Sequence, residues 1–111
     1  MKIDPAKIRT DFERLRGQLA QVEWISHGYV QDRGPGAGGP CYQWTRKEAG
    51  KTVSVALSKE QYEALGEAIK NWRKVEEILN DMEILSRQII FSTLPDIRRR
   101  KKLTKKVLGL K

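Results

Sequence analysis

A helical pattern that runs unbroken from residue 58 to residue 93 constrains the fold of this chain more than any other feature. Apolar side chains recur there at spacings of three and four residues, and no proline interrupts the pattern before Pro95. Ser58 followed by Gln61 matches a capping box at the helix start. Such a helix measures about 50 Å, which is too long for a chain of 111 residues unless something pairs with it. Its apolar positions are Tyr62, Leu65, Ile69, Trp72, Val75, Leu79, Met82, Leu85 and Ile89.

A second, shorter helix is predicted before it in the sequence. Asp4 and Pro5 suit the N-cap and the first helical position, and apolar residues then follow at alternating gaps of four and three, which is a heptad seam. We expect this helix over about residues 4–24, packed against part of the long helix as an antiparallel hairpin. Its apolar residues are Ile8, Phe12, Leu15, Leu19 and Val22.

The shorter helix covers only part of the long one, so the remaining apolar surface needs another partner. We expect a second copy of the chain, as a homo-oligomer, or another protein along the long helix. The predicted partner interface consists of Leu65, Ile69, Trp72, Leu79 and Met82.

Residues 25–57 carry a different pattern, typical of short antiparallel strands. We expect a first strand over residues 25–32 and two further strands with alternating apolar and polar side chains. The stretch 34–40, rich in glycine and proline, cannot form regular structure. The predicted fold class is therefore α+β, with an N-terminal helix, a short antiparallel β-meander and a long C-terminal helix. We expect a single domain over residues 1–95 and a basic tail over 96–111.

The positive charge is concentrated in that tail. The formal net charge is +8, and residues 96–111 hold eight Lys or Arg against Asp96 alone, which leaves the other 95 residues at +1. A run of cations repels itself and is uncommon without an anionic ligand, and phosphate contacts release counterions, which gives affinity even to an unstructured segment. The predicted nucleic-acid-binding residues of the tail are Arg98, Arg99, Arg100, Lys101, Lys102, Lys105 and Lys106.

A second predicted basic patch lies on the meander, at Arg46, Lys47 and Lys51. Tyr42 and Trp44 beside these cations match the composition of a sheet face that stacks unpaired bases. However, aromatic residues on the apolar face of a meander are more often part of the core. We therefore predict the two aromatic residues as core and the three cations as phosphate contacts.

Residues suited to catalysis or cofactor binding are scarce. His27 is the one histidine and Cys41 the one cysteine, so we predict no disulfide within the chain and no cysteine-based metal site. Residues 34–39 formally match a dinucleotide-binding glycine motif but lead into a strand, and residues 50–52 resemble the end of a P-loop without its first glycine. We expect no enzyme activity, no cofactor and no metal.

A cytoplasmic location is expected, because the sequence has no apolar core of a signal peptide and no apolar run long enough to span a bilayer. The tail also contains apolar residues, which leaves a membrane-surface helix open as a further alternative.

Short motifs follow one another in a distinctive order over roughly residues 12–90. They are Gly28-Tyr29-Val30, Gly39-Pro40-Cys41-Tyr42, Arg46-Lys47, Gly50-Lys51-Thr52 and Asn71-Trp72-Arg73. In this series the chain resembles an uncharacterised family of small prokaryotic proteins, often encoded near transposase or other mobile-element genes. Members commonly carry a cysteine knuckle, C-G-K-x-x-C-x-C, where this chain has residues 34–39, so no metal or redox role of those cysteines transfers. The resemblance implies a fold and a mobile-element setting more than an activity.

Two functions remain open from the sequence. The first is a nucleic-acid-binding accessory protein of a mobile-element or other nucleoprotein complex, whose tail contacts the phosphates of DNA or RNA without reading bases. The second is a helix-mediated structural adaptor or oligomerisation protein with no direct nucleic-acid role. Binding that falls steeply with salt favours the first, and a protein complex that survives high salt favours the second.

Overall fold

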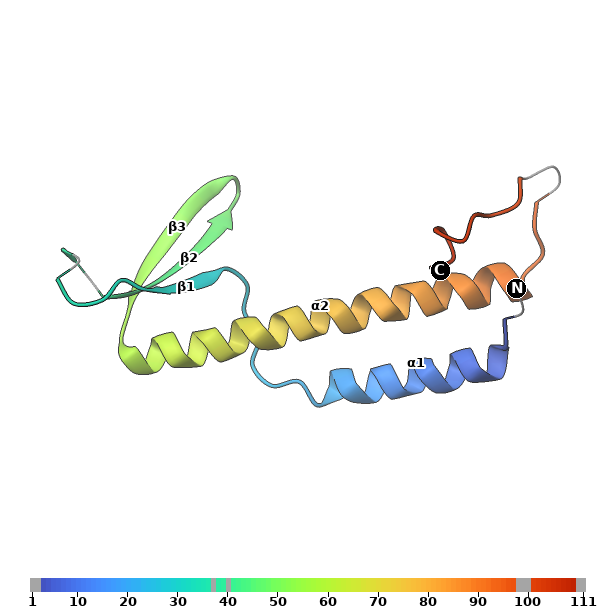
Figure 1. The fold of residues 1–111 in the computed structure, drawn as a ribbon, viewed down its shortest axis with the longest axis horizontal. Helices are drawn as coiled ribbons and strands as arrows, with labels where there is room; N and C mark the ends of the chain where they lie inside the picture. The colour runs from blue at the N-terminus through green and yellow to red at the C-terminus, as the bar shows by residue number, and fades with distance from the viewer. Residues whose placement is uncertain (1–2, 37, 40, 98–100, 110–111) are drawn as a thin grey trace. The chain divides into compact units, whose positions relative to one another are not determined.

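The computed structural model describes residues 3–36, 38–39, 41–97 and 101–109. In chain order, these residues form α1 (Pro5–Ala20), β1 (Tyr29–Asp32), β2 (Tyr42–Glu48), β3 (Lys51–Leu57) and α2 (Lys59–Thr93) (Figure 1). This is the α+β fold that the sequence predicts. The chain divides into two compact units, residues 1–21 with 76–111 (unit 1) and residues 22–75 (unit 2), so α2 contributes to both.

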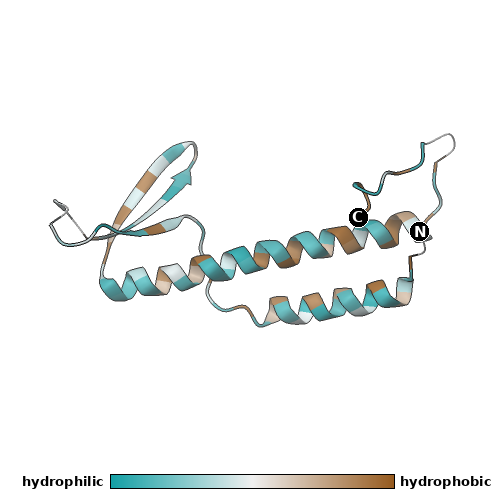
Figure 2. Cartoon of the chain, viewed as in Figure 1, coloured by the Kyte–Doolittle hydropathy of each residue, from teal (hydrophilic) through white to brown (hydrophobic). Residues whose placement is uncertain are grey.

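The sheet of unit 2 is an antiparallel meander in which β2 lies between β1 and β3. The turn between β2 and β3 holds Ala49 and Gly50 at φ of 50° and 80°, and positive φ at both central residues is typical of the type I′ turn of two-residue hairpins. This turn sets the register in which Trp44 pairs with Val55. Hydrophobic and hydrophilic residues alternate along β3 (Figure 2), as the sequence predicts.

One face of this sheet packs against the first part of α2. The ring centroids of Tyr42 on β2 and Tyr62 on α2 are 4.7 Å apart. Val30 of β1 lines a hollow together with Tyr62 and Ile69 of α2. Tyr42 and Trp44 are half-buried, in keeping with their predicted place in the core.

The first helix and the first strand are both shorter than predicted. Helix α1 ends four residues earlier and β1 begins four residues later than the sequence pattern indicates. The segment between them bonds to α2 instead: the N–H of Ser26 donates to the carbonyl oxygen of Ala68 at 3.1 Å, and the amide of Asn71 donates to the carbonyl oxygen of Trp24 at 2.9 Å. Because α2 supplies these partners, residues 22–28 satisfy backbone groups without extending the helix or the sheet.

Both helices begin as the sequence predicts. The carboxylate of Asp4 accepts hydrogen bonds from the backbone N–H groups of Ala6 and Lys7, at 3.0 and 3.4 Å. At α2, the N–H of Gln61 donates to Oγ of Ser58 at 3.1 Å, and the N–H of Ser58 donates to Oε1 of Gln61 at 3.0 Å. The predicted N-cap and capping box are therefore confirmed.

In unit 1, α1 runs antiparallel to residues 76–93 of α2 (Figure 1). The buried apolar side chains in the described part of this unit are Ile8, Leu15 and Ile78. The sequence pattern favours Leu79 over Ile78 as a seam residue, but Ile78 is 4% exposed and Leu79 is 41% exposed. Both residues are apolar and adjacent, so the orientation of α2 against α1 decides which of the two is buried.

Candidate functional site

Four lysines of the C-terminal segment carry charge that no described residue neutralises. All four are exposed, and none forms a salt bridge with a residue that the structure describes. They are Lys101, Lys102, Lys105 and Lys106. The other predicted tail residues, Arg98, Arg99 and Arg100, lie outside the described residues. The segment therefore presents four free ammonium groups to an anion.

The cations on the helices of unit 1 are paired, in contrast to these lysines. The guanidinium groups of Arg9 and Arg16 both lie beside the carboxylate of Glu13 on α1, at 3.4 and 3.3 Å. On α2, Arg87 pairs with Glu83 at 3.5 Å. Such pairs, three or four residues apart on one helix, neutralise charge locally. Among the residues of unit 1 that the structure describes, the unpaired positive charge is therefore concentrated in the C-terminal segment.

The end of this segment is docked on α2. The N–H of Leu108 donates to the carbonyl oxygen of Thr104 at 3.4 Å, which closes a turn. Nε2 of Gln88 then donates to the carbonyl oxygen of Leu108 at 2.9 Å. Gly109, with φ +69°, lies so close to Ile84 that a Cβ at this position would clash with its side chain. The lysines are therefore carried on a segment that is attached to α2 both before and after them.

The meander does not bring Arg46, Lys47 and Lys51 together on one face. Arg46 and Lys47 are adjacent on β2, so their side chains point to opposite faces of the sheet. Lys51 pairs in register with Glu48, which is on the same face as Arg46. Lys47 and Lys51 are exposed and without a salt bridge to a described residue, whereas Nη2 of Arg46 pairs with Glu48 at 2.9 Å. The predicted second patch is thus two separate lysines on opposite faces.

Arg46 packs within unit 2. Its side chain is 21% exposed, and its guanidinium carbon lies 4.3 Å from the ring centroid of Trp44, a cation–π contact. Trp44 is held in turn by its indole N–H, which donates to the carbonyl oxygen of His27 at 3.0 Å. Nη1 of Arg46 is buried without a hydrogen-bond partner. Trp44 is therefore the link between the sheet and the segment that precedes β1, and Arg46 packs on Trp44.

The five residues predicted as a partner interface divide between the units. In unit 2, Leu65 and Trp72 are half-buried and Ile69 is 5% exposed. In unit 1, Met82 is half-buried and Leu79 is 41% exposed. Leu79 is therefore the member of this set that most exposes its side chain to a partner.

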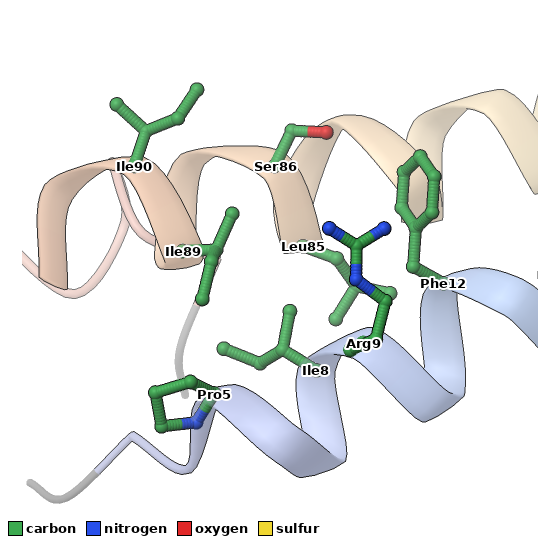
Figure 3. A pocket seen from close by; sticks show the side chains of 8 residues that line it. All are labelled: Pro5, Ile8, Arg9, Phe12, Leu85, Ser86, Ile89 and Ile90. Carbon is green, nitrogen blue, oxygen red and sulfur yellow. The ribbon is translucent and has the colours of Figure 1, made fainter. Parts of the chain in front are cut away.

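An apolar groove separates the first half of α1 from the last turns of α2 in unit 1. It has a volume of about 430 Å³ and is lined by Pro5, Ile8, Arg9, Phe12, Leu85, Ser86, Ile89 and Ile90. Figure 3 shows Ile8 of α1 and Ile89 of α2 pointing toward each other across the groove, while Ile90 points away from α1. The groove continues into exposed apolar surface at Ile90, which is 47% exposed.

Among the described residues, no group of three His, Cys, Asp or Glu side chains lies close enough together to hold a metal ion. No helix in the same part of the chain is long and apolar enough to cross a membrane. The chain matches no family model, no curated protein and no solved structure. The resemblance to the family associated with mobile elements therefore rests on its short motifs and stays a prediction.

Sequence reasoning does not identify the groove, although it places Phe12, Leu85 and Ile89 in the helical seam. A seam of the heptad kind accounts for one apolar residue at each of these turns. The signal for a wider apolar face is the pair Ile89-Ile90, because two adjacent isoleucines extend the apolar stripe beyond the width of a seam.

Proposed function

We propose that this protein binds the phosphate backbone of nucleic acid through its basic C-terminal segment, as an accessory protein of a mobile-element or other nucleoprotein complex. The observation that supports this proposal is the set of exposed lysines that form no salt bridge with a described residue, in a unit whose helix cations are paired. Ammonium groups on phosphate release condensed counterions, and this release is the main source of sequence-independent affinity.

Contact with phosphates alone positions a protein on nucleic acid without selecting a sequence. The four lysines stand as two adjacent pairs, Lys101-Lys102 and Lys105-Lys106, and the second pair lies inside the docked turn. Lys47 is a separate candidate contact on the open side of the meander. We therefore expect binding with a steep dependence on salt and little preference for base sequence.

The deciding experiment compares two variants with the same change in net charge. The first replaces the four described tail lysines with alanine and keeps the docked turn. The matched control replaces four exposed cations of α2 with alanine: Lys59, Lys70, Arg73 and Lys74. Fluorescence anisotropy with duplex DNA, single-stranded DNA and structured RNA, at several salt concentrations, gives the affinity and its salt dependence for each.

We expect the tail variant to lose affinity and the control to retain most of it. The slope of log K against log salt is negative, and each phosphate contact removed reduces its magnitude by about 0.9 on duplex DNA. Equal losses in both variants would show that diffuse net charge, and not the tail, carries the binding. No binding of the full chain to any of the three ligands would rule out the proposal.

The second candidate function is the helix-mediated adaptor, and the groove with the exposed Leu79 and Ile90 is the observation that favours it. An adaptor is expected to bind no nucleic acid and to form a stoichiometric complex with a partner protein. That complex should survive high salt and be lost in Leu79→Asp.

A further inference from the structure

The apolar surface of unit 1 extends along one side of α2. Leu79, Ser86 and Ile90 follow one another at intervals of seven and four residues, which places them on one face of the helix. Ser86 and Ile90 line the groove, so Leu79 lies on the groove's face, about 16 Å away along the helix axis. Leu79 and Ile90 are 41% and 47% exposed. One face of a two-helix layer thus carries a groove at one end and an exposed leucine at the other.

The docked C-terminal turn leaves this face open. The turn contacts Ile84 and Gln88 of α2, which stand two residues before and two residues after Ser86. Residues two positions apart on a helix point in nearly opposite directions, so the turn and the Leu79–Ile90 face occupy opposite sides of α2.

Unit 1 also has opposite charges at its two ends. The end that holds the groove, residues 5–12 and 85–93, contains three cations and one carboxylate, for a net charge of +2. The other end, residues 13–20 and 76–84, contains two cations and five carboxylates, for a net charge of −3. Of these carboxylates, Glu76 and Glu83 stand three residues before and four residues after Leu79, so they share its face of α2. Glu76 forms no salt bridge with a described residue.

From these observations we infer that a second copy of the chain docks on this face in antiparallel orientation, as a symmetric dimer in which Leu79 of each copy enters the groove of the other. A two-fold axis across the helices places the cationic end of each copy on the acidic end of its partner, so both ends of the contact are complementary. The same operation brings each exposed leucine to an apolar groove, which is the self-complementary arrangement of an isologous interface.

The dimer would convert two helical hairpins into a four-helix layer structure with a closed core. In the parallel alternative like ends face each other, so a net charge of +2 faces +2 and a net charge of −3 faces −3. The two copies then repel each other at both ends. Because the docked turn with Lys105 and Lys106 lies on the opposite side of α2, the interface leaves these two lysines free, and this inference does not depend on the proposed nucleic-acid role.

The first test is the oligomeric state of the full chain by sedimentation velocity over a range of concentrations. We expect a dimer for the unmodified chain and a monomer for Leu79→Asp and for Ile90→Asp. The matched control is Val55→Asp on β3, because Val55 has the same 41% exposure but lies in unit 2. Circular dichroism checks that each variant keeps its helices. A monomer at every concentration, or a dimer that both aspartate variants leave intact, would overturn the inference.

The second test concerns orientation and reverses the charge at one end of unit 1 at a time. Arg9→Glu with Arg87→Glu makes both ends of a copy acidic, and Glu76→Lys with Glu83→Lys makes both ends basic. In the antiparallel dimer each variant alone associates several-fold more weakly, while an equimolar mixture forms a heterodimer in which both end contacts attract. In a parallel dimer each reversal leaves like charges against like charges, as in the unmodified chain. A variant that alone associates as strongly as the unmodified chain would therefore overturn the antiparallel arrangement, and a mixture that associates no better than its components would overturn the charge complementarity.

Discussion

Gln88 and Leu108 are twenty positions apart in sequence, yet Nε2 of Gln88 donates a hydrogen bond to the carbonyl oxygen of Leu108 at 2.9 Å. This bond, together with the contact between Gly109 and Ile84, attaches the C-terminal turn to α2. The attachment determines how the lysines before it are presented, and it can be removed by substitution.

We expect Gln88→Ala to release the turn and leave α2 intact. A single hydrogen bond of this kind contributes about 0.5–1.5 kcal/mol, so amide hydrogen exchange over residues 104–109 should accelerate up to roughly tenfold. The neighbouring Arg87→Ala breaks only the salt bridge to Glu83 and serves as the control. Unchanged exchange in Gln88→Ala would show that the bond does not hold the turn.

Substitution by alanine at two glycines should change the free energy of unfolding in opposite directions. Gly28 has φ +97°, and a Cβ there would lie 2.6 Å from the carbonyl oxygen of Thr45 and 2.8 Å from Nε1 of Trp44. Gly17 is inside α1, and a Cβ there meets nothing within 4 Å. We expect Gly28→Ala to lower the free energy of unfolding by more than about 1 kcal/mol, and Gly17→Ala to raise it by about 0.5–1 kcal/mol.

Urea denaturation followed by circular dichroism measures both changes on the same scale. A neutral or stabilising Gly28→Ala would contradict the close approach of the segment before β1 to the sheet. A destabilising Gly17→Ala would contradict the exposed position of Gly17 on α1.

The capping box should account for measurable stability at the start of α2. Ser58→Ala removes the Oγ acceptor of the Gln61 N–H, and the loss of such a cap costs about 1 kcal/mol. Ser92, near the other end of α2, donates its hydroxyl to the carbonyl of Ile89 and is exposed, so Ser92→Ala is the control. Thermal unfolding should separate the two variants clearly, and equal midpoints would exclude a capping contribution.

Alanine substitutions of the adjacent cations Arg46 and Lys47 should have different effects on the stability of the protein. Arg46→Ala removes the cation–π contact with Trp44 and the salt bridge to Glu48, and we expect a loss of about 1 kcal/mol. Lys47→Ala changes an exposed side chain without a salt bridge to a described residue, and should stay within about 0.5 kcal/mol. Chemical denaturation with Trp fluorescence detects the first change directly, and equal effects would show that the stacking is unimportant.

Local signals in the sequence were sufficient to predict the elements that local bonds define. The N-cap at Asp4 and the capping box at Ser58 involve residues two or three positions apart, and both are confirmed. The turn at residues 49–50 is local in the same sense, because its glycine accepts positive φ at no steric cost. The order of helix, meander and long helix follows from these signals together with the spacing of apolar residues. That spacing is three or four residues in the helices and two in the strands.

Features that depend on distant contacts were not predicted. The end of α1 and the start of β1 differ from the predicted positions because Asn71 of α2 bonds to the backbone at Trp24. No short-range sequence pattern predicts that bond. The burial of Ile78 and exposure of Leu79 depend on how α2 faces α1. The separation of Arg46 from Lys47 follows from the alternation of side chains along a strand, but the stacking of Arg46 on Trp44 depends on the side-chain conformations in the folded sheet.

The docked turn ties the C-terminal end of the basic segment to α2, so the segment is constrained at both ends. A chain held at two points explores a much smaller volume than one held at a single point, and the entropy of closing it is lost once, on folding. The binding of an anion by these lysines then costs less conformational entropy. The turn at residues 104–109, although it carries little core of its own, therefore works as a device that concentrates charge beside one stretch of helix before any ligand arrives.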